Sequence, residues 1–305
     1  MRRVQYERQG GPEVLEIGEV DPPHAGPGEV RVQVRTAGLN PLDAKIFSGA
    51  PTAQKHEVYF PSGNGNDFAG VVDEVGSGVT GLRLGDVVLG GLLRQAQAEA
   101  VVVPADRVVV KPDELSLEQA GALDIVARTA WASVASLDLG VQDTVLVSAA
   151  AGGVGVVAAQ LARRAGATVI GTASEGNHEF LRSLGVIPVA YGPGVAERVH
   201  AAAATPVTAV LDNHGRETVQ AGLDLGVPTA RINSIADYAA VRHLGVAGVG
   251  ASRAGTSELA VVADLVGSGA VRLPMEAVYP LERVQEAYRH LASGHLRGKI
   301  VLAVG

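Results

Sequence analysis

The sequence predicts an α/β protein, and three observations support this fold class. The 305 residues are 47% hydrophobic but only 4% aromatic, so we expect an interior of Val, Leu, Ile and Ala, as in sheets buried on both faces. Short β-rich runs fill the chain up to about Val110. After Pro112, apolar strands alternate with amphipathic helices, which is typical of a doubly wound parallel sheet of the Rossmann type.

The first part of the chain, from Val4 to Val110, predicts a mainly antiparallel, barrel-like β-domain. Its apolar runs are short, rich in β-branched residues and separated by Gly and Pro, which favours strands joined by turns. These runs are "EVRVQVRTAGL", "FAGVVDEVG", "DVVLGG" and "EAVVVPADRVVVKP".

The segment "DELSLEQAGALDIVARTAWASVAS" predicts one helix, with Ser116 as its N-cap and Gln119 completing a capping box. From "TVLVSAA" to "TARINSI" strands and helices then alternate, which predicts βαβ units. In the tail, "ELAVVADLVGSG" and "LERVQEAYRHLASG" predict amphipathic helices that end at Gly, and "KIVLAV" predicts a last strand. We interpret the glycine-bearing segment "GVAGVGASRAG" as a strand at a sheet edge.

Charge and composition exclude several classes of function. The net charge is -7 and no run of Lys or Arg occurs, so neither nucleic acid nor an anionic membrane surface is an expected partner. No segment reaches the roughly 18 apolar residues of a membrane span, and no apolar stretch follows the two arginines at the start, so we expect a cytoplasmic protein. The chain has no Cys, which excludes disulfides, thiolate zinc sites and a Cys nucleophile.

The glycine turn in "TVLVSAAAGGVGVVAAQLARRAGA" is the strongest local motif. Gly152, Gly153 and Gly155 lie between an apolar strand and an amphipathic helix. Glycines at such a turn let main-chain amides approach a pyrophosphate, and the helix N-terminus adds partial positive charge. The alternative is a turn that is Gly-rich only for close packing. A second strand, "TVIG", follows at the expected distance and favours dinucleotide binding.

The end of that second strand bears on the choice between NAD and NADP. An NAD site usually carries Asp or Glu there to hold the ribose 2′-hydroxyl. This chain has Thr172, Ala173 and Ser174 at the position, which favours NADPH. Glu175 argues for NADH, no Arg or Lys stands at this strand tip in the sequence, and Ser174 has an alternative role as a helix N-cap.

Taken together, these motifs resemble the zinc-independent quinone oxidoreductases, the zeta-crystallin-like branch of the medium-chain dehydrogenases/reductases. The resemblance runs over essentially the whole chain and rests on "AGLNPLDAKIFSG", "GNDFAGVVDEVGSGVTGLRLGDVV", "RTAW", the glycine turn and "PLERVQEAYRHLASGHLRGKIVL". It implies a Rossmann domain inserted in a GroES-like catalytic domain of the β-barrel type. The implied division is 1–120 and 269–305 for the catalytic domain and 121–268 for the dinucleotide-binding domain.

The resemblance also implies the site residues. Asn40 and Asp43 would line the nicotinamide cleft, although Asn40 before Pro41 is also a common turn residue and Asp43 a possible helix cap. Asn177 falls where many relatives carry a Lys for the 2′-phosphate. The nearest candidate for a proton-donating tyrosine is Tyr59, which could instead pack in the barrel, so we assign no proton donor. The implied cofactor-binding residues are Asn40, Thr129, Gly152, Gly153, Val154, Gly155, Ser174, Asn177, Tyr191 and Asn213.

No metal site is expected. Zinc-dependent relatives carry a Cys at the position of Asn40 and a His-Glu pair at the positions of Asn66 and Asp67, and the eight His residues show no ligand spacing. Without a metal to polarise a carbonyl, the resemblance implies hydride transfer from NADPH to a quinone or an α,β-unsaturated carbonyl compound. The alternative is an NADPH-binding protein with little turnover. A homodimer is expected by the same analogy, with "GVAGVGAS" as a pairing edge.

Overall fold

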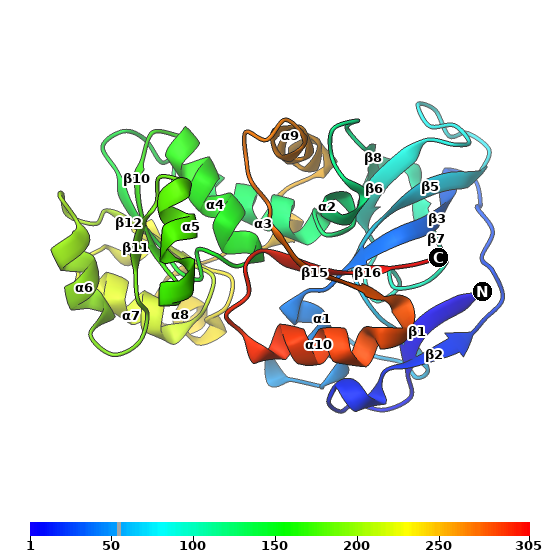
Figure 1. The fold of residues 1–305 in the computed structure, drawn as a ribbon, viewed down its shortest axis with the longest axis horizontal. Helices are drawn as coiled ribbons and strands as arrows, with labels where there is room; N and C mark the ends of the chain where they lie inside the picture. Colours follow the sequence, from blue (N-terminus) through cyan, green and yellow to red (C-terminus); the bar gives the residue numbers. More distant parts are fainter. Residues whose placement is uncertain (54–55) are drawn as a thin grey trace.

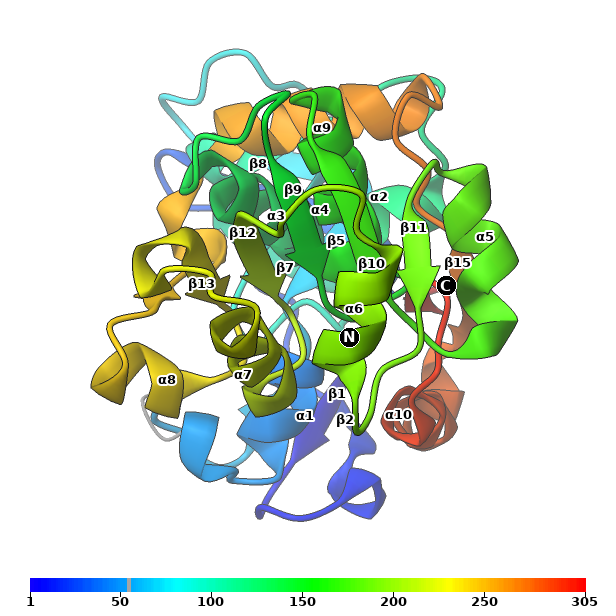
Figure 2. The same ribbon diagram turned by 90° about the vertical axis from the view of Figure 1, so that its left-hand side faces the viewer.

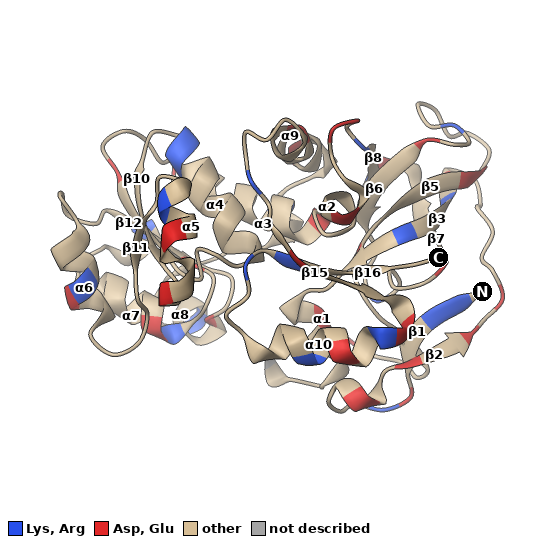
Figure 3. Cartoon of the chain, in the orientation of Figure 1, with Lys and Arg blue, Asp and Glu red and all other residues tan. Residues whose placement is uncertain are grey.

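The computed structural model describes residues 1–53 and 56–305. Figure 1 shows two parts side by side, one built from the two ends of the chain and one from its middle. The six-stranded sheet of the middle part and the seven-stranded sheet of the other part confirm the predicted α/β fold. In Figure 3, basic and acidic residues are interspersed over both parts. Within the described residues, no helix is both long and apolar enough to cross a membrane.

The part that contains both termini is built around a long central strand, β3 (Glu29–Gly38). Its inward side chains are β-branched and fully buried, and its neighbours are antiparallel. The other strands of the seven-stranded sheet are β5 (Asp67–Val75), β6 (Val87–Gly91), β7 (Ala100–Pro104), β8 (Val108–Val110), β15 (Met275–Pro280) and β16 (Lys299–Ala303). A small sheet of β1 (Arg2–Tyr6), β2 (Glu16–Glu19) and β4 (Ser62–Gly63) and the helices α1 (Pro41–Phe47) and α10 (Val284–Ser293) complete this part.

The middle part is a six-stranded parallel sheet in the order β11-β10-β9-β12-β13-β14, which is the doubly wound order of a dinucleotide-binding fold. Its strands are β9 (Thr144–Val147), β10 (Thr168–Thr172), β11 (Ile187–Val189), β12 (Ala209–Asp212), β13 (Ile232–Ser234) and β14 (Ala247–Gly248). Its helices are α4 (Gly153–Arg164), α5 (His178–Ser183), α6 (Val195–Ala202), α7 (Arg216–Asp224) and α8 (Tyr238–His243). Figure 2 shows several of these helices in front of the sheet.

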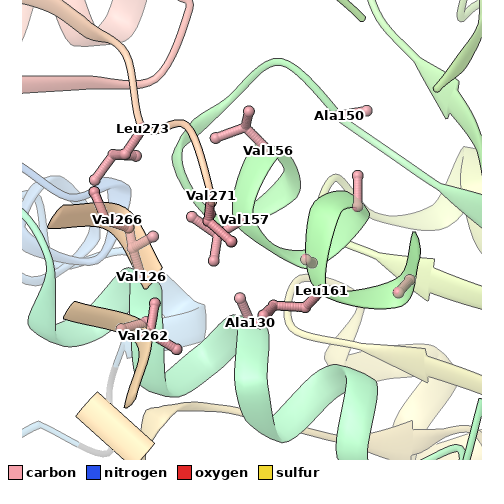
Figure 4. Packing of buried hydrophobic residues seen from close by; sticks show 14 of the residues in the cluster. Val126, Ala130, Ala150, Val156, Val157, Leu161, Val262, Val266, Val271 and Leu273 are labelled. Atoms are coloured by element: carbon pink, nitrogen blue, oxygen red, sulfur yellow. The ribbon is translucent and has the colours of Figure 1, made fainter. Parts of the chain in front are cut away.

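Three further helices lie between the two sheets: α2 (Leu117–Gly121), α3 (Asp124–Ala135) and α9 (Thr256–Gly267). Figure 4 shows the core between them, where Val157 and Leu161 of α4 face Val126 and Ala130 of α3, with Val262 of α9 beside them. These side chains are aliphatic and almost fully buried, as the low aromatic content predicts.

One predicted element is wrong in detail. The segment 113–136 forms two helices rather than one, although the predicted capping box of Ser116 and Gln119 is present. Gly121, the last residue of the first helix, packs on β3: a Cβ there would lie 2.2 Å from Thr36 Oγ1. The backbone then turns tightly, with the amide of Leu123 bonded to the carbonyl of Ala120.

The predictions for the tail are confirmed. Helices α9 and α10 are followed by Gly269 and Gly294 at positive φ, β16 is the last strand, and β14 lies at the edge of the parallel sheet. The chain returns to the seven-stranded sheet through β15 and β16, so strands from before and after the parallel sheet share one sheet. The residue boundaries 120 and 268 of the division stay a prediction.

Candidate active site

The carboxyl ends of four neighbouring parallel strands form one side of the site. In open α/β sheets, ligands bind outside this edge, where the strand order reverses. Strands β9, β10, β11 and β12 end at Val147, Thr172, Val189 and Asp212. The predicted cofactor-binding residues that follow them within a few positions are Gly152, Gly153, Val154, Gly155, Ser174, Asn177, Tyr191 and Asn213. The topology therefore brings eight of the ten to one edge.

The three glycines of the turn meet different neighbours. A Cβ on Gly155 would lie 2.1 Å from the carbonyl oxygen of Ala149, so this glycine is required for the helix to pack on the turn that follows β9. A Cβ on Gly153 would lie 2.8 Å from Cδ of Lys299, whereas one on Gly152 would meet only the Ala149 oxygen at 3.3 Å. Close packing therefore explains the glycine at position 155. It does not explain the glycine at position 152, which faces the open side of the turn.

The open side of the turn fits an anion. Gly152 is the N-cap of α4 and has no side chain to accept from the first amides of this helix. Those amides and the helix dipole favour negative charge, as in a pyrophosphate site. Nearby, Asn213 bonds Ser148 through its main-chain N–H and its Nδ2, at 2.8 and 3.0 Å. Its Oδ1 is buried without a hydrogen-bond partner.

The guanidinium of Arg297 lies at the tip of the second strand, although Arg297 is 120 residues away from Asn177 in the sequence. Ser174 caps a single 3-10 turn without a side-chain cap bond, and Asn177 ends this turn. The Asn177 amide donates to Ser174 Oγ at 3.3 Å and accepts from Arg297 Nε at 2.9 Å. Tyr191 is 43% exposed, and its ring centroid lies 6.1 Å from that of His295. The expectation that no Arg or Lys stands at this tip holds only for the local sequence.

The other two predicted cofactor-binding residues, Thr129 and Asn40, and the predicted catalytic residue Asp43 lie on other elements. Thr129 lies on α3 and is buried. Asn40 and Asp43 lie at the start of α1, where they form the capping box of this helix. The Asn40 amide N–H donates to Asp43 Oδ2 at 2.8 Å. The turn and cap roles considered as alternatives for these two residues are therefore present, and their roles towards substrate stay predictions.

Asn40 and Asp43 belong to a buried polar cluster, defined by the eight residues Asn40, Asp43, Asn64, Asn66, Asp67, Gln97, Tyr288 and Lys299, each at most 4% exposed. Asp43 accepts from three donors: the Asn40 amide, the side-chain amide of Asn66 and the Tyr288 hydroxyl at 3.0 Å. The Tyr288 oxygen in turn accepts from Asn64 at 3.0 Å and Gln97 at 2.8 Å.

Lys299 links this cluster to the glycine turn. Its Nζ donates to the carbonyl of Leu39 at 2.7 Å and to Asn40 Oδ1 at 2.6 Å, and lies 3.7 Å from Asp67 Oδ2. Its side-chain carbons pass beside Gly153. Asp67 also accepts from Asn40 Nδ2 at 3.1 Å and from the Ile125 amide in the first turn of α3, at 3.1 Å. One buried ammonium therefore holds Asn40 next to the N-terminus of α4.

Burial shifts the ionisation of the cluster. It raises the pKa of Asp43 to about 7, although the hydrogen bond from Asn40 and the charge of Lys299 oppose the shift. Burial likewise raises the pKa of Asp67 and of Tyr288 and lowers the pKa of Lys299. In Asp124, which adjoins Asp67 and is paired with Arg128 at 3.2 Å, burial raises the pKa to about 6. Perturbed groups of this kind gather at functional sites.

The positions at which the resemblance places zinc ligands do not fit a metal. Asn40 and Asn66 present amides that bond other cluster members, and the Lys299 ammonium stands beside Asp67. An ammonium and a divalent cation would repel each other at such distances. Among the residues described, no three His, Asp or Glu side chains are grouped to hold a metal ion.

The alternative given for Tyr59 is wrong. Tyr59 does not pack in the barrel: it is 75% exposed and its hydroxyl donates to Glu57 Oε2 at 2.9 Å. The tyrosine that lies beside Asp43 is Tyr288 of α10, 245 residues away in the sequence. Its buried hydroxyl was missed because nothing in the helix pattern of α10 distinguishes it from a core aromatic.

Two family models match the chain: the alcohol dehydrogenase GroES-like domain over residues 26–113 and the zinc-binding dehydrogenase over residues 194–302. A quinone oxidoreductase of Salmonella typhimurium is 32% identical over 73% of this chain and 68% of its own length. The pikromycin polyketide synthase component PikAII of Streptomyces venezuelae is 34% identical over 93% of this chain. The chain spans only 8% of that relative's length and 53% of that of a Pseudomonas aeruginosa quinone oxidoreductase.

Solved structures agree over the whole chain. The quinone oxidoreductase from Coxiella burnetii superposes with a TM-score of 0.91 at 32% identity, over 100% of this chain and 99% of its own. A structure described as an NAD-dependent alcohol dehydrogenase has a TM-score of 0.88 at 30% identity and covers both chains fully. The agreement extends to both sheets, because each comparison covers the full length.

Proposed function

The chain belongs to the quinone oxidoreductase branch of the medium-chain dehydrogenases/reductases, and from this premise we propose that it is a zinc-independent, NADPH-dependent reductase of quinones or α,β-unsaturated carbonyl compounds. The general class, an oxidoreductase that uses a nicotinamide cofactor, follows from the family. The choice of NADPH, the acceptor and the roles of single residues are the proposal.

One observation carries the proposal: the glycine turn and the buried polar cluster meet at Lys299. This residue touches Gly153 with its side-chain carbons and bonds Asn40 with its ammonium group. A dinucleotide whose pyrophosphate lies on the first turn of α4 would extend its reactive end towards Asn40 and its adenosine end towards Ser174 and Asn177. Bound NADPH would supply the hydride, and the chain would bind it, orient it and exclude water.

The acceptor class follows from the chemistry of the cluster. The positions of Asn40, Asn66 and Asp67 carry no set of ligands that suits zinc, so the proposed acceptor is already electrophilic and does not need a metal to polarise its carbonyl. Relatives named quinone oxidoreductase support the quinone option. We keep the enone option because both acceptors take hydride at an activated double bond.

The preference for NADPH is supported by the second strand. Its end, Thr172 to Ser174, offers hydroxyls and no carboxylate to hold a 2′-hydroxyl. Arg297 adds positive charge at the same tip. We also propose, by analogy alone, a cytoplasmic homodimer that pairs through the edge strand β14.

The test is direct. The protein is mixed with NADPH and a panel of small quinones and enones, and the cofactor absorbance is followed. Oxidation of NADPH that depends on protein and acceptor supports the proposal. Tight NADPH binding without oxidation across the panel would refute it.

A second candidate is an NADPH-binding protein with little turnover. The observation that favours it is the internal commitment of the two proposed catalytic side chains: Asn40 bonds Asp67 and Lys299, and Asp43 bonds Asn66 and Tyr288. Side chains that bond other residues of the protein stabilise its fold and have few hydrogen bonds left to offer a substrate. The same absorbance experiment decides between the two candidates.

A further inference from the structure

We propose that Arg297 is the residue that recognises the 2′-phosphate of NADPH and so sets the cofactor preference. The inference rests on the proposed function and names a residue that sequence reasoning did not select. It is carried by a cavity of about 460 Å³ between the end of β10 and the segment that leads into β16. The cavity is lined by Ser174, Gly176, Asn177, Pro274, Met275, Glu276, His295 and Arg297.

Arg297 is held in place by three contacts. Its Nε donates to Asn177 Oδ1 at 2.9 Å and its Nη2 to the carbonyl of Gly176 at 3.3 Å. The guanidinium carbon lies 4.9 Å from the centre of the Phe180 ring, which is a cation–π distance. These two bonds use two of the five guanidinium N–H groups, so three can donate to a phosphate. The fork is oriented before a ligand arrives, which limits the entropy lost on binding.

The residues around Arg297 suit a phosphate monoester beside a ribose. Ser174 and Asn177 supply a hydroxyl and an amide at the strand tip where an NAD site would carry an acid. His295 lines the cavity, and its ring centroid lies 6.1 Å from that of Tyr191, with the two rings tilted by 45°. A guanidinium pairs with phosphate through short, charge-assisted hydrogen bonds, which a ribose hydroxyl cannot match.

One carboxylate opposes an anion in this cavity. Glu276 lines it, and its Oε2 accepts from the main-chain N–H of Arg297 at 2.9 Å, while its Oε1 lies 3.9 Å from His290. Its negative charge is therefore near the proposed phosphate position. Arg297 and Glu276 must act in opposite directions on the affinity for NADPH. Substituting Glu276 therefore tests the proposal independently, with the opposite expected change in affinity.

Arg297 also stands at a specific place in the chain. The next residue, Gly298, has a φ of 78° and donates its N–H to the carbonyl of Ala151 at 2.8 Å, beside the glycine turn. The residue after that, Lys299, bonds Asn40. Three consecutive residues thus lie along the adenosine end, the pyrophosphate turn and the reactive end of the proposed site. Recognition of the 2′-phosphate would fix the segment that positions Asn40.

The alternative is that Arg297 only braces Phe180 and the Asn177 turn. Arg272 provides a matched control, because its guanidinium carbon lies 5.4 Å from the centre of the same Phe180 ring but it does not line the cavity. Dissociation constants for NADPH, NADH, 2′,5′-ADP and 5′-AMP are measured by calorimetry on the wild type, Arg297→Met, Arg272→Met and Glu276→Gln. Melting temperatures of the unliganded variants confirm that each is folded.

We expect Arg297→Met to raise the dissociation constants of NADPH and 2′,5′-ADP by roughly 10- to 100-fold, because a charge-assisted contact is lost. The dissociation constants of NADH and 5′-AMP should change by less than about twofold. Arg272→Met should leave all four unchanged, and Glu276→Gln should tighten the two phosphorylated ligands. If Arg297→Met keeps the wild-type preference for NADPH, or weakens NADH equally, the inference is wrong while the proposed function stands. If the wild type binds NADH as tightly as NADPH, the proposed cofactor preference and this inference both fall.

Discussion

The carboxyl end of the parallel sheet and the buried polar cluster are built by different means. At the sheet end, glycines and the first amides of α4 form the turn, and Gly152 and Gly155 are close neighbours in sequence. In the cluster, side chains bond one another, and the bonded residues, such as Asn40 and Lys299, are up to 259 positions apart. The glycine turn is a property of one βαβ unit, whereas the cluster exists only when the whole chain is folded.

This difference predicts how each region fails. A main-chain site is lost when a side chain fills the space that a ligand or a strand needs, and no change of charge is involved. A buried cluster of charges is lost when one member is removed, because its partner remains desolvated and unpaired. Substitutions in the two regions should therefore differ in both size and pH dependence.

The largest effect is expected for Gly155→Val. Its Cβ would lie 2.1 Å from the main-chain oxygen of Ala149. The free energy of unfolding of the variant should therefore fall by more than about 5 kcal/mol, and NADPH should not stabilise it. Gly152→Ala should fold, because its Cβ meets only one oxygen at 3.3 Å, yet it should give a smaller NADPH-induced rise in melting temperature.

Gly140→Ala is the control, since a Cβ there meets nothing within 4 Å. Thermal melting with and without NADPH measures all three variants. An unchanged NADPH shift in Gly152→Ala would mean that the turn serves packing alone.

The next largest effect is expected for Lys299→Met. Removing the ammonium leaves Asp67 buried without its cation and releases Asn40, which should destabilise the protein by about 3–5 kcal/mol. Lys45→Met on α1, a lysine outside the cluster, should change stability by less than about 0.5 kcal/mol. Urea unfolding of both variants provides the comparison. A loss in Lys299→Met no larger than that in the control would contradict the assigned role of the ammonium.

A smaller, pH-dependent effect is expected from Asp43. Its pKa of about 7 in the folded protein lies above the ordinary 3.8, so its contribution to stability is complete below about pH 4 and is lost as the pH rises through about 7. Neighbours that face it are Asp67, Lys299 and Tyr288. The free energy of unfolding should therefore decline between pH 5 and pH 8, and less steeply in Asp43→Asn.

The exposed Asp113→Asn serves as the control for this measurement and should keep the wild-type slope. Equal slopes in Asp43→Asn and the wild type would show that the carboxyl group does not titrate in this range. Asp124, whose pKa is raised in the same direction, should account for part of the remaining slope.

The smallest effect, none, is expected from chelators. If Lys299 stands beside Asp67 where zinc-dependent relatives bind metal, then EDTA should leave NADPH oxidation unchanged. Inhibition by EDTA that added zinc reverses would refute the zinc-independent proposal.

The sequence predicted the parallel sheet, the capping box of Ser116 and the edge strand β14 because these patterns are local. It predicted one helix where the structure has two, because the tight backbone turn between Ala120 and Leu123 leaves no mark in the local pattern. The same reason explains the site. Gly152 and Ser174 follow strand ends that periodicity reveals, whereas Arg297 and Tyr288 reach their partners from 120 and 245 residues away.

The central claim is that one NADPH molecule spans both regions, and a crystal structure of the complex tests it most directly. The account predicts the pyrophosphate on the amides of the first turn of α4, the 2′-phosphate on the guanidinium of Arg297 and the nicotinamide beside Asn40. A cofactor whose 2′-phosphate lies away from Arg297, or whose nicotinamide lies away from Asn40, would contradict it.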